Sequence, residues 1–545
     1  MDPVTRRGTL IAGLTGSLVL CWPSELLSQS SSPTAIATTT SGKVRGKRIR
    51  GISNFLGIPY GGDTAQRRFL PPAPPSPWTG VRECITLGHQ APQMDLGASS
   101  AAASGPNANL GSDFVKKVMA AGKQGMEVGN EGEDCLVLNV YTPDASHLHK
   151  RPVMVWLHGG GFAIGSAGDP SYDGNALARR GDVVVVGINH RLNALGYLYL
   201  GALSDDFADS GNVGQLDIVL ALQWVRDNIV NFGGDPGNVT IFGESGGGAK
   251  VSVMLAMPSA KGLFHKAIIQ SGPGLVMGER ADAAAHADRT LVKLGVAPAD
   301  VHKLLSMDYR RVIDAASATQ GRGGRVLGPL VDGRSLPRHP FTPTAPDISR
   351  DIPIMIGSTK DEASLFISAD PLFGIMTEQQ ARDRASQMNA AKGNQAISIF
   401  KALRPNDAPT YWLSSLATAQ GTWINSIRLA ERKLAQHAAP VYMYRLDWEA
   451  PFEGGALKSP HGLDSPLVFD NAEAKPLMNG TGPEPKKVAS AMSQAWINFA
   501  RSGDPSQRML EWLAYDNTSR KTMIFNVQSH LVADPDRDAR ILFSS

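Results

Sequence analysis

The chain has 545 residues and a formal net charge of +3 at neutral pH, and 42% of its residues are hydrophobic while 19% are charged. These proportions are typical of a globular protein with a large core, and they exclude a disordered or highly charged chain. No dense basic stripe with interleaved aromatic residues is present, so nothing indicates binding to nucleic acid. We therefore expect small molecules as partners.

The first residues have the features of an export signal. Arg6 and Arg7 stand just before the apolar stretch 10–22, and residues 35–37 (Ala-Ile-Ala) offer a small-x-small cleavage site. We expect residues 1–37 to be a bacterial twin-arginine-type signal and the mature protein to be periplasmic or secreted. The apolar stretch is shorter than the ~20 residues of a membrane span, so a stable membrane anchor is the less favoured alternative.

The cysteines bear on the same question. If Cys21 leaves with the signal, the mature chain keeps Cys84 and Cys135, an even pair in an exported protein. We expect a disulfide between them, with two buried free thiols as the alternative. The long insertion between these cysteines contains segment 97–111, which is rich in Ala, Ser, Gly and Asn and is predicted to be a mobile surface loop.

Beyond the signal, apolar or alternating runs predict strands, and runs with helical spacing occur between them. The expected strands are 42–46, 52–60, 133–141, 153–157, 183–189, 239–242, 267–270, 352–356 and 441–445. The expected helices are 216–225, 249–257 and 488–500, with a mainly helical cap over the sheet edge from 370 to about 439. This alternation implies one α/β domain, residues 38–545, with a mostly parallel central sheet flanked by helices.

A glycine-flanked serine, Gly-Glu-Ser-Gly-Gly at 243–247, stands between a predicted strand and a predicted helix. This is the context of a nucleophile elbow, in which the serine occupies a strained turn whose neighbours pack together. Glycines suit those neighbouring positions because a side chain there would clash. We expect Ser245 to project above the sheet, where it can attack an acyl carbon. An ordinary glycine-rich turn is the alternative.

A second glycine-rich turn, at 158–162 (His-Gly-Gly-Gly-Phe), directly follows the predicted strand 153–157. Successive glycines leave backbone N–H groups unobstructed, as the binding of a developing oxyanion requires. We interpret this turn as part of an oxyanion hole, with a simple flexible turn as the alternative.

Acyl transfer by a serine needs a base and a carboxylate that orients the base, and α/β-hydrolases place the acid and then the histidine after the serine. Asp361 and Glu362 follow the predicted strand 352–356, where an acid should emerge. His461 follows the predicted strand 441–445 after a loop, where the histidine should emerge. On position alone, either acid fits.

Taken together, these motifs resemble the type-B carboxylesterase family, which includes bacterial nitrobenzyl-type esterases, animal carboxylesterases and cholinesterases. The resemblance extends over nearly the whole mature chain. The matching segments are 55–60, 68–69, 133–136, 159–161, 243–247, 270–272, 361–362, His461 and 496–505. It implies an α/β-hydrolase fold with a helical cap and a long loop insertion near the N-terminus. It also implies a serine carboxylesterase that works through an acyl-enzyme intermediate.

The resemblance assigns three groups of residues to the site: the triad Ser245, His461 and Glu362; the oxyanion-hole donors Gly160, Gly161 and Gly246; and the supporting residues Glu244 and Ser271. In this scheme the serine is the nucleophile, the histidine is the general base and then acid, and Glu362 is favoured over Asp361 as the orienting carboxylate. The resemblance implies no metal or organic cofactor, a small ester as substrate, and a monomeric or weakly associating protein.

The chain departs from the family pattern at two places. Position 246 is Gly where most relatives carry Ala. The insertion between Cys84 and Cys135 contains no tryptophan, whereas cholinesterases use one there to bind a quaternary ammonium group, so choline esters are not expected as preferred substrates. Two alternatives to an esterase are a non-catalytic binding protein on the same scaffold, as in adhesion members that lose a triad residue, and a lipase or amidase with the same triad.

Overall fold

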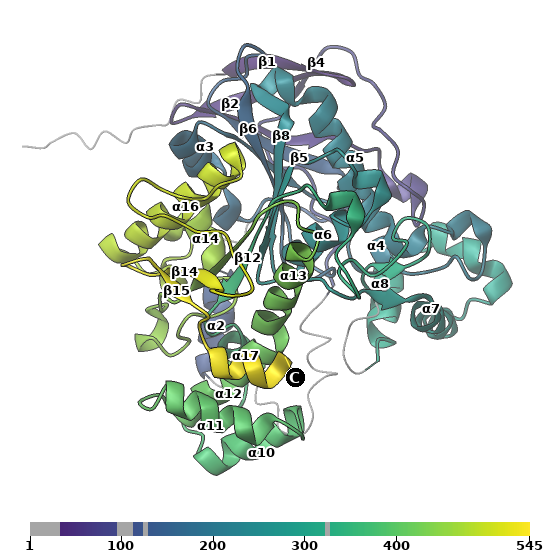
Figure 1. The fold of residues 1–545 in the computed structure, drawn as a ribbon. Coiled ribbons are helices and arrows are strands. Elements are labelled where there is room, and N and C mark those ends of the chain that lie inside the picture. The colour runs from purple at the N-terminus through teal and green to yellow at the C-terminus, as the bar shows by residue number, and fades with distance from the viewer. Residues whose placement is uncertain (1–32, 95–112, 124–128, 322–326, 545) are drawn as a thin grey trace, which may run out of the picture.

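The computed structural model describes residues 33–94, 113–123, 129–321 and 327–544 (Figure 1). A mixed sheet runs through the centre, with strand order β1-β2-β3-β5-β7-β6-β8-β9-β12-β13-β14-β15 and with β4 paired to β2. Its strands are β1 (Pro33–Thr39), β2 (Gly42–Ile49), β3 (Ile52–Pro59), β4 (Val81–Glu83), β5 (Val137–Thr142), β6 (Arg151–Leu157), β7 (Val184–Ile188), β8 (Gly234–Glu244), β9 (Lys266–Gln270), β12 (Ile354–Thr359), β13 (Val441–Leu446), β14 (Lys521–Phe525) and β15 (His530–Ala533). Two short strands, β10 (Gly278–Glu279) and β11 (Leu330–Val331), pair separately.

The helices of the described residues are α2 (Asp113–Lys123), α3 (Asn175–Gly181), α4 (Asn193–Tyr197), α5 (Val213–Asn228), α6 (Gly246–Met254), α7 (Arg280–Leu294), α8 (Tyr309–Ala318), α9 (Ala363–Ile367), α10 (Glu378–Met388), α11 (Gly393–Leu403), α12 (Pro409–Thr418), α13 (Ile424–Leu434), α14 (Asp464–Val468), α15 (Pro476–Asn479), α16 (Pro483–Ser502) and α17 (Arg537–Ser544). None of them combines the length and the apolar character that a bilayer span requires.

The sheet is parallel from β7 across to β14, and antiparallel among β1, β2, β3, β5 and β7 and between β14 and β15. Helices α3, α14 and α16 lie on one side of it, and α5, α6 and α13 lie on the other (Figure 1). The central strands are buried throughout because both faces are covered, which explains their nearly unbroken apolar sequences. The predicted α/β architecture is therefore confirmed.

Alternate residues of one strand reach two different cores, because successive side chains point to opposite faces of a sheet. In β6, Val153 and Val155 join the core formed with α5, α6 and α13. Met154 and Trp156 join the core formed with α16. The sheet is thus fixed between two packed helical layers, and its strands lead into loops at their carboxyl ends.

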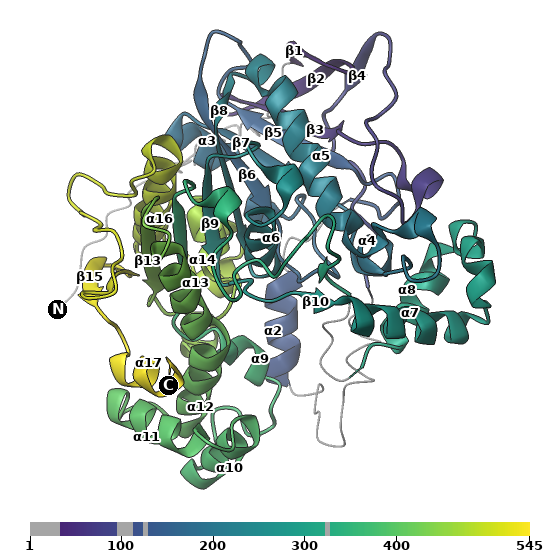
Figure 2. The ribbon, with the colours of Figure 1, turned by 45° about the vertical axis from the view of Figure 1, so that its right-hand side comes forward.

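Further helices extend away from the sheet. Helices α7 and α8 pack together beside α4, to the right in Figure 2. The segment predicted to be a helical cap contains α10, α11, α12 and α13. Helices α10 to α12 pack on one another, whereas α13 packs against β12 and β13. Only α13 of this group contacts the sheet closely, so α10 to α12 form a projecting layer at the lower edge of Figure 2.

The insertion differs in part from its prediction. Residues 113–123 form helix α2, whose Phe114 stacks against Phe373 and packs near Phe452. Sequence composition did not indicate this helix, because its apolar face is completed by residues far along the chain. The loop predicted at 97–111 lies outside the described residues.

The predicted disulfide is wrong: Cys84 and Cys135 are both buried free thiols. The backbone of Cys84 continues the pairing of β4, with its N–H donating to the carbonyl of Arg45 at 2.7 Å. Cys135 instead lies close enough to Arg191 and Asp217 for their charges to act on its thiol. Burial raises the pKa of Cys84 to about 11. An even number of cysteines was therefore a poor guide to disulfide pairing, because both thiols are buried and remain free.

The export prediction remains a prediction. Residues 1–32, which include the paired arginines, lie outside the described residues. The predicted cleavage position after Ala37 lies within β1, which pairs with β2.

Candidate active site

Ser245 occupies a sharp turn between β8 and α6, at the carboxyl end of a central strand. Its φ of 58° and ψ of −122° are disfavoured for any residue with a side chain. Its N–H donates to the carbonyl of Gln270 at 2.9 Å, which helps to hold the turn. A Cβ on Gly243 would meet the backbone of Gly247 at 2.6 Å. Glycine is therefore needed on both sides of the serine, as the sequence indicated.

His461 lies between Ser245 and Glu362. Its Nε2 is 2.8 Å from Oγ of Ser245, and its Nδ1 hydrogen-bonds Oε2 of Glu362. The histidine comes from the loop after β13, and the glutamate stands after β12 at the start of α9. Parallel strands bring these distant segments to the same edge of the sheet. In this arrangement a proton can pass from the hydroxyl to the imidazole while the carboxylate fixes the tautomer.

Glu362 is held firmly in place. Its side chain is buried, and its Oε1 accepts hydrogen bonds from Oγ of Ser271 at 2.5 Å and from the N–H of Thr359 at 2.7 Å. These donors leave Oε2 for the histidine. Ser271, predicted as a supporting residue, thus contacts the carboxylate and not the histidine.

The neighbouring acid has a different environment. Asp361 is also buried, but its Oδ1 pairs with Nη1 of Arg404 at 2.5 Å, and its Oδ2 accepts from the N–H of Ser459 at 3.4 Å. No contact joins it to His461 in the described structure. Of the two acids that sequence position allowed, Glu362 is the one that contacts the histidine.

Two further carboxylates surround the histidine. Oε1 of Glu244 lies 3.3 Å from Nε2 of His461, and both Glu244 and Asp464 are buried. Burial raises the pKa of Glu244; His461 opposes this shift, and the nearby Asp464 and Glu362 add to it. Burial alone would lower the pKa of His461, but the charges of Glu244 and Glu362 outweigh it, so this pKa is raised.

Asp464 was not among the predicted site residues. Its Oδ2 accepts hydrogen bonds from Nε2 of Gln270 at 3.0 Å and from the hydroxyl of Tyr444 at 2.8 Å. Burial raises its pKa to about 6. The available signal was its position three residues after His461, at the start of α14, but an acid after a glycine-containing turn is too common to be diagnostic.

The predicted oxyanion donors are backbone N–H groups at two turns. Gly160 and Gly161 have φ values of 82° and 62°, and Gly246 is the first residue of α6. Across the described structure, the N–H groups of Gly160, Gly161 and Gly246 donate to no protein acceptor. A Cβ on Gly246 would overlap the carbonyl oxygen of Gly161. Glycine at position 246 thus allows the two turns to approach more closely than alanine would.

An aromatic side chain stands at the edge of this site. Phe366, on α9, is 62% exposed, and its ring lies 5.1 Å from the ring of His461. An exposed phenyl ring beside the imidazole offers an apolar surface to a bound ester. Sequence analysis did not identify it, because only the helix after Glu362 brings it over the histidine.

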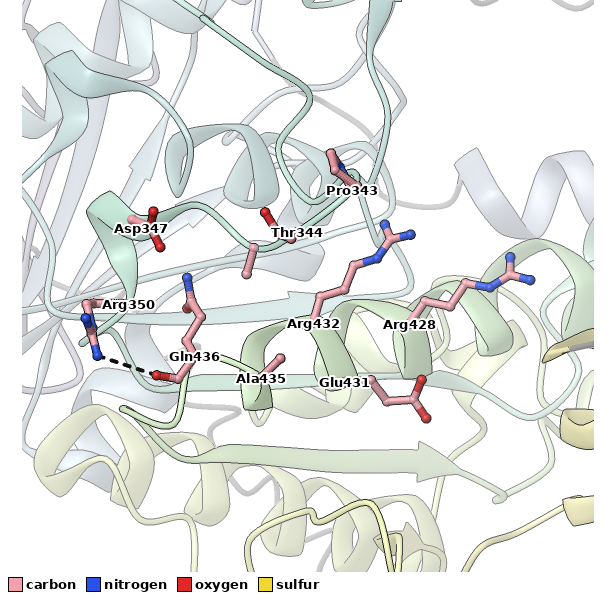
Figure 3. Close-up of a pocket in the computed structure, with 10 residues that line it drawn as sticks. Pro343, Thr344, Asp347, Arg350, Arg428, Glu431, Arg432, Ala435 and Gln436 are labelled. Atoms are coloured by element: carbon pink, nitrogen blue, oxygen red, sulfur yellow. Dashed lines mark hydrogen bonds between the residues drawn. The ribbon is translucent and has the colours of Figure 1, made fainter.

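A hollow of about 720 Å³ lies elsewhere, between α13 and residues 343–350, and is lined by none of the three predicted triad residues (Figure 3). Arginine side chains line it, but they are already bonded within the protein. Arg432 donates to Thr342 Oγ1 at 2.9 Å, and Arg428 donates to the carbonyl of Phe543 at 2.8 Å. We assign no role in ester chemistry to this hollow.

In the described part of the chain, no group of three or more His, Cys, Asp and Glu side chains could hold a metal ion.

The strand–turn–helix around Ser245, followed along the chain by Glu362 and His461 on a mostly parallel sheet, defines an α/β-hydrolase. Residues 33–543 match the model of the Carboxylesterase family. The chain therefore belongs to the carboxylesterase family and is a carboxylic ester hydrolase.

Individual relatives agree with this assignment. The chain is 33% identical over 515 residues to the para-nitrobenzyl esterase of Bacillus subtilis, covering 93% of this chain and 97% of that protein. It is 32% identical to the phenmedipham hydrolase of Pseudarthrobacter oxydans, covering 87% of this chain and 91% of that protein. The crystal structure of a Geobacillus stearothermophilus carboxylesterase superposes with a TM-score of 0.77 at 37% identity, covering 93% of this chain and 99% of that chain.

Proposed function

We propose that this protein hydrolyses small carboxylic esters through an acyl-enzyme intermediate formed on Ser245, with His461 as the base and Glu362 as the orienting carboxylate. The observation that carries the proposal is the continuous chain of contacts from Oγ of Ser245 through His461 to Glu362.

Each chemical step follows from that chain. Nε2 of His461 takes the hydroxyl proton as Ser245 attacks the ester carbonyl carbon, and the buried Glu362 stabilises the imidazolium. The oxyanion receives hydrogen bonds from the N–H groups of Gly160, Gly161 and Gly246. His461 then protonates the departing alcohol. Water attacks the acyl-enzyme with the same base, and the acid and free serine are released.

Aryl and short alkyl esters are the substrates we propose. Two of the relatives are named for their substrates, a para-nitrobenzyl ester and phenmedipham. Phe366, exposed beside the imidazole, would give an aromatic alcohol or acyl group an apolar surface to contact.

The test is the initial hydrolysis rate of p-nitrophenyl esters from acetyl to palmitoyl, measured for the wild type and S245A. We expect activity on the short esters, lost in S245A. A preference for palmitoyl would instead indicate a lipase. If S245A remained as active as the wild type, the proposed nucleophile would be wrong, and two equally inert proteins would favour the binding-protein alternative.

We also propose that the chain is exported, because Arg6 and Arg7 precede the apolar stretch 10–22. Fractionation of bacteria that produce the wild type or a variant with both arginines changed to lysine tests this proposal, and retention of the variant in the cytoplasm is the expected result.

A further inference from the structure

A buried lysine lies behind the predicted oxyanion turn. Lys250 is on α6, the helix that begins directly after Ser245, and its side chain is 0% exposed. Its Nζ donates a hydrogen bond to the carbonyl of His158 at 2.8 Å. The same Nζ lies 5.8 Å from the ring centroid of Phe162. One ammonium group thus contacts the first and the last residue of the turn that carries the glycines.

The charge of this lysine has no partner of opposite sign. Within the described ranges, no carboxylate forms an ion pair with Lys250, and the His158 carbonyl is its one hydrogen-bond acceptor. The rings of His158 and His190 stack 4.9 Å apart nearby. Burial and the charge of Lys250 lower the pKa of both histidines, so they stay neutral and add no positive charge beside the lysine.

A buried cation without a counterion is destabilising, so a neutral residue at this position would make the folded protein more stable. In agreement with this cost, burial lowers the pKa of Lys250 to about 7. A group of this kind beside a reacting centre is more typical of a functional site than of a packing position.

We propose that Lys250 is a positioning residue for the oxyanion hole. It holds the turn 158–162 through its contacts with His158 and Phe162, and in its protonated form it places a positive charge beside the turn from which Gly160 and Gly161 donate. The oxygen of the ester carries full negative charge only after Ser245 attacks. The lysine therefore stabilises the transition state more than the bound ester. This inference rests on the proposed function of the glycine N–H groups.

The chain supplies a matched control. Lys433, on α13, is also buried, and it too contacts backbone carbonyls. Its Nζ donates to the carbonyls of Ser349 at 2.6 Å and Arg350 at 2.7 Å and to Oε1 of Gln436 at 3.1 Å. The ammonium group of Lys433 therefore makes three hydrogen bonds, and none of its three acceptors belongs to the proposed triad. Lys433 therefore represents a buried lysine with a purely structural role.

The experiment compares K250M with K433M in hydrolysis of p-nitrophenyl butyrate and in inhibition by a trifluoromethyl ketone, which forms a tetrahedral adduct with the serine. Loss of a direct oxyanion donor lowers kcat by about 10²–10³-fold, so we expect a smaller loss, about tenfold, for a residue that acts through the turn. In K250M, KM should change little and inhibitor affinity should fall in parallel with kcat. K433M should lose thermal stability while its kcat and inhibitor affinity stay near the wild-type values.

K250Q provides a second variant in case K250M does not fold. It keeps an N–H donor but no charge, and we expect only partial recovery of kcat. Wild-type kcat and inhibitor affinity in K250M or K250Q, or an equal loss in K433M, would overturn the inference. S245A separates the two proposals. An inert S245A beside an unaffected K250M refutes the role of Lys250 alone, whereas an active S245A refutes the proposed nucleophile itself.

Discussion

Two buried clusters of charged residues in this molecule are built differently. Around His461, Oε1 of Glu244 and Oδ1 of Asp464 have no hydrogen-bond donor in the described structure. The pair of Arg191 and Asp217 is complete by contrast. The N–H and Nε of Arg191 each donate to Oδ2 of Asp217 at 2.9 Å, and Nη2 donates to Oδ1 at 2.6 Å.

This difference indicates a catalytic role for the first cluster and a structural role for the second. A buried carboxylate oxygen without a hydrogen-bond donor is energetically costly, and beside a histidine it is typical of a functional site. A buried ion pair with every oxygen satisfied has no proton to exchange, and it fixes the segments it joins. Arg191 also donates to the carbonyl of Leu70 at 2.9 Å and so ties down the chain near the N-terminal strands. Loss of a group from the first cluster should change rates, and loss from the second should change stability.

The largest effect is expected from E362Q. Glutamine keeps the shape of Glu362 but cannot stabilise the imidazolium of His461, so kcat should fall by about 10⁴-fold with little change in the thermal midpoint. Steady-state hydrolysis of p-nitrophenyl butyrate and a melting curve measure the two quantities. D361N is the matched control, because it breaks the adjacent pair with Arg404. It should lower the thermal midpoint far more than kcat, and a similar loss of kcat in both variants would contradict the assignment of the acid.

D217N should have the opposite signature. The guanidinium of Arg191 would remain buried without its counterion, at a cost of about 3–5 kcal/mol in the free energy of unfolding. Denaturant unfolding followed by circular dichroism measures this loss, and kcat of the folded variant at 25 °C should match the wild type. A D217N protein as stable as the wild type but slower in catalysis would reverse the comparison between the clusters.

The smallest effect is a shift in pH dependence. In the proposed mechanism only the neutral imidazole of His461 accepts the serine proton, so activity should fall in acid as this group is protonated. Because neighbouring carboxylates raise its pKa, the acid limb of kcat/KM should lie above the ordinary histidine value of ~6.5. Removing the charge 3.3 Å from Nε2 lowers that pKa, so the limb should move to lower pH in E244Q, by about one unit. An unmoved limb would mean that Glu244 carries no charge in the working enzyme, and a rate that stayed flat down to about pH 4 would argue against a histidine base.

Local sequence patterns were sufficient for much of this description. The buried strands, the turn around Ser245 and the glycine turn at 158–162 depend on neighbouring residues. Steric demands at Gly243 and Gly247 act over a few positions, so the sequence expresses them directly. Sequence patterns that extend over only a few residues thus predicted the sheet and the segments that meet at its carboxyl edge.

Long-range packing decided the rest. Sequence did not reveal α2, because its partners lie hundreds of positions away, and it wrongly paired the two cysteines. Position along the chain left Asp361 and Glu362 equivalent, and only the family resemblance favoured Glu362. In the structure Arg404 pairs with Asp361, whereas Ser271 donates to Glu362.

The sequence by itself determined the strand–turn–helix elements and the order of serine, acid and histidine along the chain, because both depend on local sterics and linear position. Only the tertiary structure showed the contact between Glu362 and His461, the two free buried thiols and the lysine buried beside the glycine turn. Burial, charge pairing and pKa depend on groups that approach one another only after the sheet has formed.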